Sequence, residues 1–158
     1  MKHDEIARNL FLHGANCSQA VLGAFAKECG ILETDAFRIA SGFGGGFARM
    51  RSICGAVSGM CLVLNYIYAS SNIMDKTVKD AQYKLVQDAV KQFTAQTGSF
   101  ICKELLLSSG NSAESSSNSS ERTSTYYSKR PCIEMVSLAV TIIESILEKK
   151  TPDKLEQV

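Results

Sequence analysis

Features that commonly assign a function are missing from this sequence of 158 residues. The formal net charge is only +1, which excludes the strong positive field typical of proteins that bind nucleic acids or membrane surfaces. Tryptophan is absent, and no segment of useful length alternates apolar and polar residues as a strand would. A Walker motif, an H-E-x-x-H pattern, a dinucleotide fingerprint and a Ser/His/Asp order are all missing. We therefore expect no nucleic-acid partner and no nucleotide, zinc-protease or serine-hydrolase chemistry.

A secretion signal is not indicated either, because the N-terminal residues MKHDEIARNLF carry charges throughout and contain no apolar run. We therefore expect a cytoplasmic protein, in which disulfides are rare and cysteines more often bind metals or take part in catalysis. One uncharged stretch, 52–74, is long enough to cross a bilayer. Its serines, asparagines and tyrosines favour instead the central helix of a bundle, covered by neighbouring helices on every side.

The apolar residues recur at helical spacing, which predicts an all-α fold: a compact bundle of about five to seven helices in one domain, 1–158. Gly55 and Gly59 lie four residues apart in the central helix, which would let another helix approach closely. Residues 108–130 are rich in serine and lack an apolar period, which predicts a long, flexible loop. Helices are expected over 3–13, 17–29, 34–40, 53–69 and 75–97, near Cys102 and from Pro131 onward. N-caps are expected at Asn16 (a capping box with Gln19), Thr34, Ser52 and Ser99.

The stretch from Gly42 to Gly59, GFGGGFARMRSICGAVSG, combines a glycine run, two arginines and a cysteine. If Ser52 caps the following helix, Cys54 lies in its first turn, near amide groups without a partner and at the positive end of the helix dipole. Both effects, with Arg49 and Arg51 nearby, favour the thiolate, so we predict that Cys54 is the most reactive thiol. The alternative interpretation is a turn between helices followed by an ordinary buried cysteine.

Four of the six cysteines share one kind of position. Each falls in the first turn of a predicted helix and begins the apolar stripe of that helix, whereas Cys29 lies at a helix end and Cys61 within one. Alternate helices of an antiparallel bundle begin at the same end, and the loop before the last helix is long enough to return there. The thiols predicted to meet at this end, surrounded by helix N-termini, are Cys17, Cys54, Cys102 and Cys132.

Three interpretations of these four cysteines remain open. They could bind zinc or an iron–sulfur cluster in a carrier or sensor, although their spacing matches neither a zinc ribbon nor a ferredoxin. Two of them could cycle between dithiol and disulfide, as in a thiol–disulfide oxidoreductase. They could also only pack together in a helical protein that acts through a partner.

The candidate site residues follow from these interpretations. His3 and His13, in the first helix, are interpreted as surface or turn histidines without a catalytic role. The glycine run and the first helical glycine would let the backbone approach a ligand. The candidates for catalysis and for metal ligation are Cys17, Cys54, Cys102 and Cys132, and those for cofactor binding are Gly44, Gly45, Gly46 and Gly55.

The order of these residues resembles the C_GCAxxG_C_C family, whose members are described as redox-active proteins. The resemblance rests on Cys17, on the motif Cys54-Gly55-Ala56-Val57-Ser58-Gly59, and on the separated Cys102 and Cys132, and it covers about residues 10–148. It implies a small helical protein with four key cysteines, often encoded near transporter genes. The implied partners are an unidentified redox partner and a transporter system, and a homodimer remains open.

Overall fold

The computed structural model describes residues 2–150. Its regular elements are all helical, and extended segments within that range pair only at one isolated antiparallel bridge, between Ile53 and Ile101. The prediction of an all-α fold is confirmed. The helices are α1 (His3–Leu12), α2 (Cys17–Ala24), α3 (Ala26–Cys29), α4 (Glu33–Ala40), the 3₁₀ turn η1 (Ser41–Phe43), α5 (Gly55–Tyr68), α6 (Lys76–Thr97), α7 (Cys102–Ser108), α8 (Ser124–Lys129) and α9 (Cys132–Lys150).

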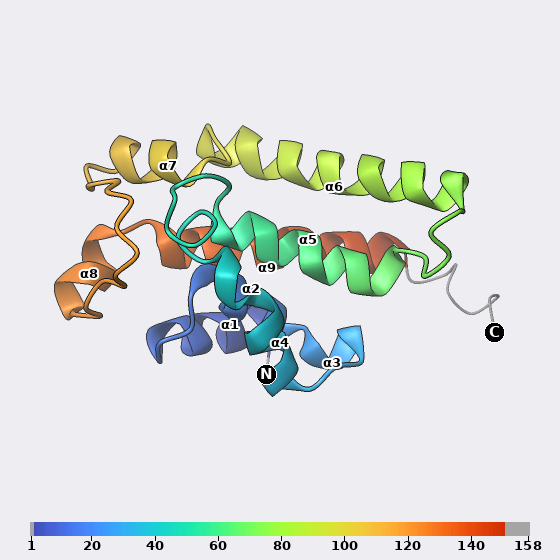
Figure 1. Cartoon of the computed structure of the whole chain (residues 1–158), viewed down its shortest axis with the longest axis horizontal. Helices are drawn as coiled ribbons and strands as arrows, with labels where there is room; N and C mark the ends of the chain where they lie inside the picture. Colours follow the sequence, from blue (N-terminus) through green and yellow to red (C-terminus); the bar gives the residue numbers. More distant parts are fainter. Residues whose placement is uncertain (1, 151–158) are drawn as a thin grey trace.

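Three helices form the middle of the molecule, where α5 and α9 lie side by side and α2 packs against both. Figure 1 shows α6 along one side of this layer and the short helices α1, α3 and α4 on the other. Helices α7 and α8 lie at the end of the bundle where α5 and α9 begin (Figure 1). The largest side chains buried between these layers include Phe11, Phe25, Phe93, Met60 and Leu64.

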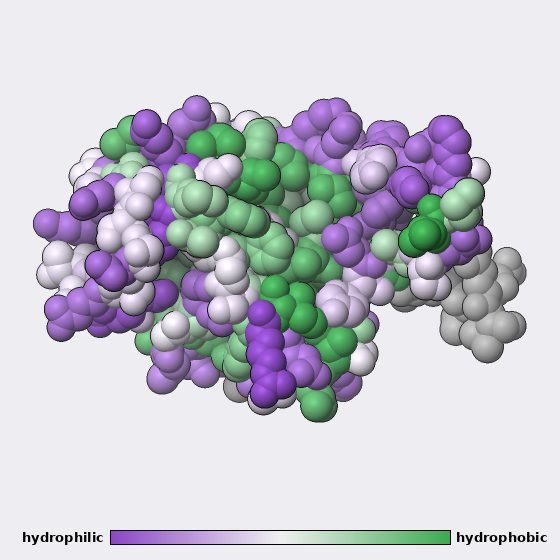
Figure 2. Space-filling model, viewed as in Figure 1, coloured by the Kyte–Doolittle hydropathy of each residue, from purple (hydrophilic) through white to green (hydrophobic). Residues whose placement is uncertain are grey.

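Within residues 2–150, none of the helices combines the length and the apolar character needed to span a bilayer. The uncharged stretch 52–74 holds α5, which is packed against α2, α6 and α9. Apolar side chains also reach the surface here: Figure 2 shows them over the middle of the molecule, with hydrophilic side chains along α6. The exposed apolar residues of α5 and of the turn before it are Phe47, Met50, Ile53 and Tyr66.

Some of the predicted helix ends are correct and others are wrong. The capping box is present, because the Gln19 backbone amide donates to the Asn16 side chain at 2.9 Å and the Asn16 amide donates to the Gln19 side chain at 3.0 Å. Helix α4 begins at Glu33 rather than after a cap at Thr34, with the negative charges of Glu33 and Asp35 in its first turn, where they favour the helix dipole. The predicted helix 17–29 is interrupted at Phe25, and the serine-rich segment 108–130 contains α8.

The close approach predicted at Gly55 and Gly59 brings α2 against α5. A Cβ atom on Gly59 would lie 2.8 Å from the Cβ of Val21 and 3.0 Å from the carbonyl oxygen of Ser18. A Cβ atom on Gly55 would lie 3.1 Å from the Cβ of Cys17. The two glycines therefore allow the helices to pack backbone to backbone, and they set Cys17 beside the beginning of α5.

His3 joins three helices rather than lying free on the surface. Its ring stacks on Phe25 with the centroids 4.1 Å apart, and its two nitrogens lie 2.9 Å from carboxylate oxygens of Glu28 and Glu144. Burial alone would lower the pKa of His3, but the hydrogen bonds and charges of the two carboxylates outweigh burial and raise it. A ring held between two carboxylates is best matched by the protonated form, in which both nitrogens donate. His13 is exposed and follows α1.

We expect Gly59→Ala to lower the free energy of unfolding by about 1–2 kcal/mol. Overpacking against Val21 and Ser18 costs about 1–3 kcal/mol and outweighs the gain of up to about 1 kcal/mol in helix propensity. Gly42→Ala is the matched control, because a Cβ there has no neighbour within 4 Å and Gly42 has no positive φ. Urea denaturation of both variants checks this, and equal stabilities would contradict the close approach of α2 and α5.

Protonation of His3 should make stability depend on pH. Because its pKa is raised in the folded state, its contribution is complete below the ordinary pKa of 6.5 and is lost as the pH rises through the folded-state pKa. Denaturation midpoints of the wild type and His3→Gln, compared at about pH 6 and about pH 8.5, should therefore converge as the pH rises. A constant difference between the two proteins would show that the charge on His3 does not stabilise the fold.

Candidate functional site

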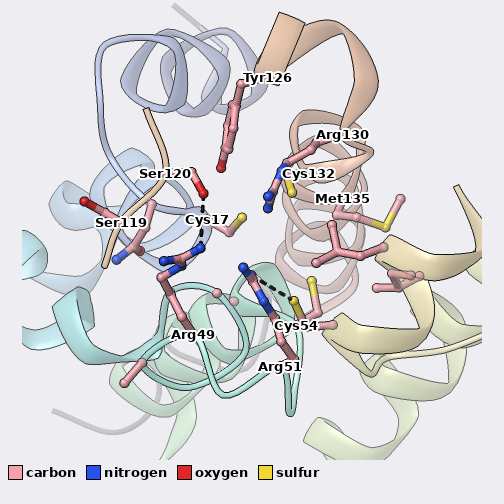
Figure 3. Close-up of a pocket in the computed structure, with 18 of the residues that line it drawn as sticks. Cys17, Arg49, Arg51, Cys54, Ser119, Ser120, Tyr126, Arg130, Cys132 and Met135 are labelled. Carbon is pink, nitrogen blue, oxygen red and sulfur yellow. Dashed lines mark hydrogen bonds between the residues drawn. The ribbon is translucent and has the colours of Figure 1, made fainter. Parts of the chain in front are cut away.

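A cavity of about 360 Å³ lies at the end of the bundle where four helices begin. The four cysteines that were predicted to meet all line it, and Figure 3 shows Cys17, Cys54 and Cys132 around the same space. Cys17, Cys102 and Cys132 are the first residues of α2, α7 and α9, and Cys54 directly precedes α5. All four are present as thiols rather than disulfides. Residues far apart along the chain are thus gathered by the starts of separate helices.

The antiparallel bridge between Ile53 and Ile101 joins the starts of α5 and α7. The Cys54 amide donates to the Phe100 carbonyl at 2.8 Å, and the Cys102 amide donates to the Ser52 carbonyl at 2.6 Å. Because these hydrogen bonds keep both segments extended, the helices begin later than predicted and neither Ser52 nor Ser99 is an N-cap. The bridge instead holds the Cys54 and Cys102 backbones next to each other.

Cys54 is itself the N-cap of α5, not the second helical residue as predicted. It is buried, and this burial raises its pKa to about 12, although the backbone amides of Ala56 and Val57 act in the opposite direction. The prediction that the helix start favours the Cys54 thiolate is therefore wrong, because loss of water outweighs the helix amides. Burial likewise raises the pKa of Cys102. The rise is limited because the Arg51 guanidinium lies 3.9 Å from the Cys102 sulfur and opposes the effect of burial.

Cys17 and Cys132 both line the cavity and act on each other's pKa. The interaction with the Cys17 thiol lowers the pKa of Cys132 to about 7, and the charges of Arg130, Arg122 and Arg51 act in the same direction against burial. The same interaction, together with burial, raises the pKa of Cys17 well above its ordinary value. Of these two thiols, Cys132 is therefore the one that ionises first, and Cys17 keeps its proton.

The chain enters α5 through a left-handed turn. The five residues from Gly45 to Arg49 all have positive φ, between 49° and 75°, and Arg51 follows at 61°. Backbone amides of Ala48, Arg49 and Arg51 donate to the carbonyls of Gly42, Gly44 and Gly45 and close the turn. Three of the five residues in the turn carry a Cβ, and left-handed backbone costs such residues about 1–2 kcal/mol each. Strain of this kind is concentrated at functional sites.

The four candidate glycines differ in position. Gly44, Gly45 and Gly55 line the cavity. Gly46 is not part of its wall; a Cβ on it would lie only 2.6 Å from the Cβ of Cys102. Its lack of a side chain therefore lets the turn pack against α7. Binding of a cofactor by these glycines remains a prediction.

Four arginines also line the cavity, and two of them were not predicted. Figure 3 shows Arg49, Arg51 and Arg130 reaching toward the cysteines from different parts of the chain. Arg51 is only 5% exposed, and Arg130 stacks on Tyr126 with 4.7 Å between the guanidinium carbon and the ring centroid. Arg122 lies over the same ring at 4.9 Å. The sequence analysis did not identify Arg122, Tyr126 and Arg130 as site residues, because they lie in the segment predicted as a loop. The two arginines on either side of a pair of tyrosines, just before Cys132, could have indicated their role.

The serine-rich segment covers one side of the cavity. Arg49 donates to the carbonyl of Ser116 at 3.0 Å and to the hydroxyl of Ser120 at 3.1 Å, and Arg51 donates to the carbonyl of Glu114 at 3.0 Å. Ser117, Ser119 and Ser120 belong to the cavity wall. These arginines therefore attach the segment to the left-handed turn. The flexibility expected of the segment remains a prediction.

The remaining cysteines do not line the cavity. The Cys61 sulfur accepts a hydrogen bond from Asn65 one turn further along α5, and Cys29 ends α3. In the part of the chain that the structure describes, no three side chains of His, Cys, Asp or Glu are arranged so that they could hold a metal ion. Ligation of zinc or an iron–sulfur cluster by Cys17, Cys54, Cys102 and Cys132 remains a prediction.

Comparison with known proteins places this chain in one family. No curated protein and no solved structure matches it. A family model described as "Putative redox-active protein (C_GCAxxG_C_C)" matches residues 15–146, which include all four cysteines of the cavity. A role in redox chemistry is thereby supported in general terms. The match spans most of the sequence, and the chain belongs to the C_GCAxxG_C_C family of redox-active proteins.

Proposed function

We propose that this protein carries out dithiol–disulfide exchange, with Cys132 as the attacking thiolate and Cys17 as the second thiol. The observation that carries the proposal is that Cys17 and Cys132 line one cavity with Arg51, Arg122 and Arg130, where the pKa of Cys132 is lowered to about 7. An attacking thiol is most effective when its pKa lies near the ambient pH, because it is then both ionised and nucleophilic. A cytoplasmic location belongs to the same proposal, since dithiols persist in a reducing compartment.

The exchange proceeds in two steps through a mixed disulfide. The Cys132 thiolate attacks one sulfur of a substrate disulfide, a Cys132–substrate S–S bond forms, and the substrate S–S bond breaks and releases a thiolate that takes up a proton. Cys17 then loses its proton and attacks the Cys132 sulfur, which releases the second substrate thiolate. The protein dithiol is oxidised to a disulfide by two electrons, and the substrate disulfide is reduced to two thiols.

Cys54 and Cys102 have a different role in this proposal. Burial raises the pKa of both, so they remain protonated at neutral pH and do not start the exchange. They line the same cavity as the reacting pair. We assign them as the thiols that receive the disulfide from Cys17 and Cys132 by a further exchange within the cavity.

The reactivity of Cys132 should depend on pH in a way that the other thiols do not share. We expect one thiol of the native protein to be alkylated by iodoacetamide with half-maximal rate near pH 7, because its thiolate is half-formed there. Cys132→Ser should remove this phase. Cys17→Ala should move it to higher pH, because the interaction with Cys17 is the largest cause that lowers the pKa of Cys132, and alanine, unlike serine, has no polar group to replace the thiol. Cys61→Ser is the matched control, since Cys61 lies outside the cavity. A reactive phase that survives in Cys132→Ser would contradict the assignment.

Mild oxidation should link Cys17 to Cys132. We expect non-reducing peptide mapping, after oxidation by a small disulfide and alkylation of the remaining thiols, to recover these two cysteines in one cross-linked pair. The reason is that the Cys132 thiolate forms first and that Cys17 is the thiol that acts most strongly on it. Recovery of Cys54 linked to Cys102, with Cys17 and Cys132 both alkylated, would move the reacting pair to the bridge between α5 and α7.

A further inference from the structure

The cysteine cavity carries a concentrated positive charge that dithiol chemistry alone does not require. Four arginines line it, and no aspartate or glutamate of the described residues does. The whole chain contains six arginines, so four of the six are gathered at this site. The one thiolate expected at neutral pH, on Cys132, balances a single positive charge. Several positive charges therefore remain without a negative partner inside the cavity.

Placing these guanidinium groups close together and partly out of water is unfavourable unless an anion lies between them. Arg51 is 5% exposed, yet the contacts of its guanidinium are the neutral carbonyl of Glu114 and the sulfur of Cys102, which burial keeps protonated. Among the described residues, the hydrogen bonds of the Arg49 side chain go to a carbonyl and a hydroxyl of the covering segment. Burial lowers the pKa of Arg49, and the charges of Arg51 and Arg130 lower it further, against smaller opposing effects of Tyr126 and Glu114. The arginines therefore repel one another. A bound anion would relieve this repulsion.

The size and enclosure of the cavity indicate a small ligand. A volume of about 360 Å³ lies in the range of small-molecule sites, about 300–1,000 Å³. Cys54 and Cys102 are buried, and the segment that contains Ser116 and Ser120 is bound across the cavity by Arg49. Cys17 and Cys132 are only partly buried, so a disulfide small enough to enter the cavity can reach them.

We propose that the substrate of the thiol pair is a small disulfide that carries carboxylates. The planar guanidinium groups of Arg49 and Arg51 match the two oxygens of a carboxylate, and both groups lie beside the thiols in Figure 3. Such a ligand would place its sulfur atoms at Cys132 while its carboxylates lie among the arginines. The inference rests on the proposed function, because it uses the exchange described above: one substrate S–S bond is broken, and the two electrons come from the Cys17 and Cys132 thiols.

Three symmetrical disulfides of similar length test the charge preference directly. They are 3,3′-dithiodipropionate (a dianion), bis(2-hydroxyethyl) disulfide (neutral) and cystamine (a dication). The rate at which each oxidises the reduced, full-length protein is divided by its rate with dithiothreitol, which corrects for the intrinsic reactivity of the disulfide. We expect the corrected rate of the dianion to exceed that of the neutral disulfide by about tenfold or more, with the dication slowest. Added salt should reduce the difference.

Arg49→Gln identifies the source of the preference. Arg49 is the suitable arginine because, unlike Arg51, Arg122 and Arg130, it is not among the charges that lower the pKa of Cys132. The ratio of dianion to neutral rates should fall about threefold or more in this variant. Arg38→Gln is the matched control, because it removes the same charge from an exposed residue of α4 that does not line the cavity. A ratio defined within each protein does not depend on the fraction of molecules that fold.

The outcomes separate the two proposals. Oxidation by all three disulfides at equal corrected rates would overturn the carboxylate preference and leave dithiol–disulfide exchange in place. An equal fall of the ratio in Arg49→Gln and Arg38→Gln would show that net charge, not the cavity, sets the preference, and would also overturn it. Failure of all three disulfides to oxidise the Cys17–Cys132 pair would overturn the proposed function and the substrate assignment together.

Discussion

The cysteine cavity depends on the left-handed turn between α4 and α5. Five successive residues, Gly45 to Arg49, have positive φ, and the hydrogen bonds of Ala48, Arg49, Arg51 and Ser52 back to the glycine run hold the chain in this shape. The turn delivers the segment before α5 in an extended form, so that it can pair with the segment before α7 at the Ile53–Ile101 bridge. That pairing, together with the packing of Gly46 against Cys102, brings Cys54 and Cys102 to one place. The conformational cost of the turn is offset by these hydrogen bonds and by its packing against α7.

Cys54 and Cys132 both lie at helix starts, yet the pKa of Cys54 is raised and the pKa of Cys132 is lowered. Burial raises the pKa of Cys54 to about 12, because the two helix amides nearby cannot replace the water that the thiolate would lose. Cys132 is also largely enclosed, but the Cys17 thiol and three positive charges outweigh burial and bring its pKa to about 7. Position at a helix N-terminus is therefore not sufficient to make a cysteine acidic. Hydrogen-bond donors and nearby full charges decide which thiol ionises.

The arginines connect the chemistry of the cavity with its enclosure. Arg49 and Arg51 come from the left-handed turn and hold the serine-rich segment, and Arg122 and Arg130 come from that segment and lie on either side of α8. Tyr126 of α8 stacks with both of these last two, which places the tyrosine and the guanidinium groups around the same thiols. A segment without an apolar period of its own is thereby attached to the rest of the molecule by polar and cation–π contacts. The same side chains that create the positive charge also cover the site.

The amino-acid sequence by itself determined the helical class, the capping box at Asn16, the close approach at Gly59 and the choice of four cysteines, because periodicity, capping and small-residue spacing act over a few residues. The sequence did not reveal that Ser52 and Ser99 fail to cap helices, since the bridge that keeps those segments extended joins residues far apart in the chain. It likewise could not show that Cys132, rather than Cys54, has the acidic thiol, or that Arg122 and Arg130 reach the cavity. Only the tertiary structure decided these properties, because burial, the interaction between thiols and the sum of nearby charges depend on groups that meet only when the chain is folded.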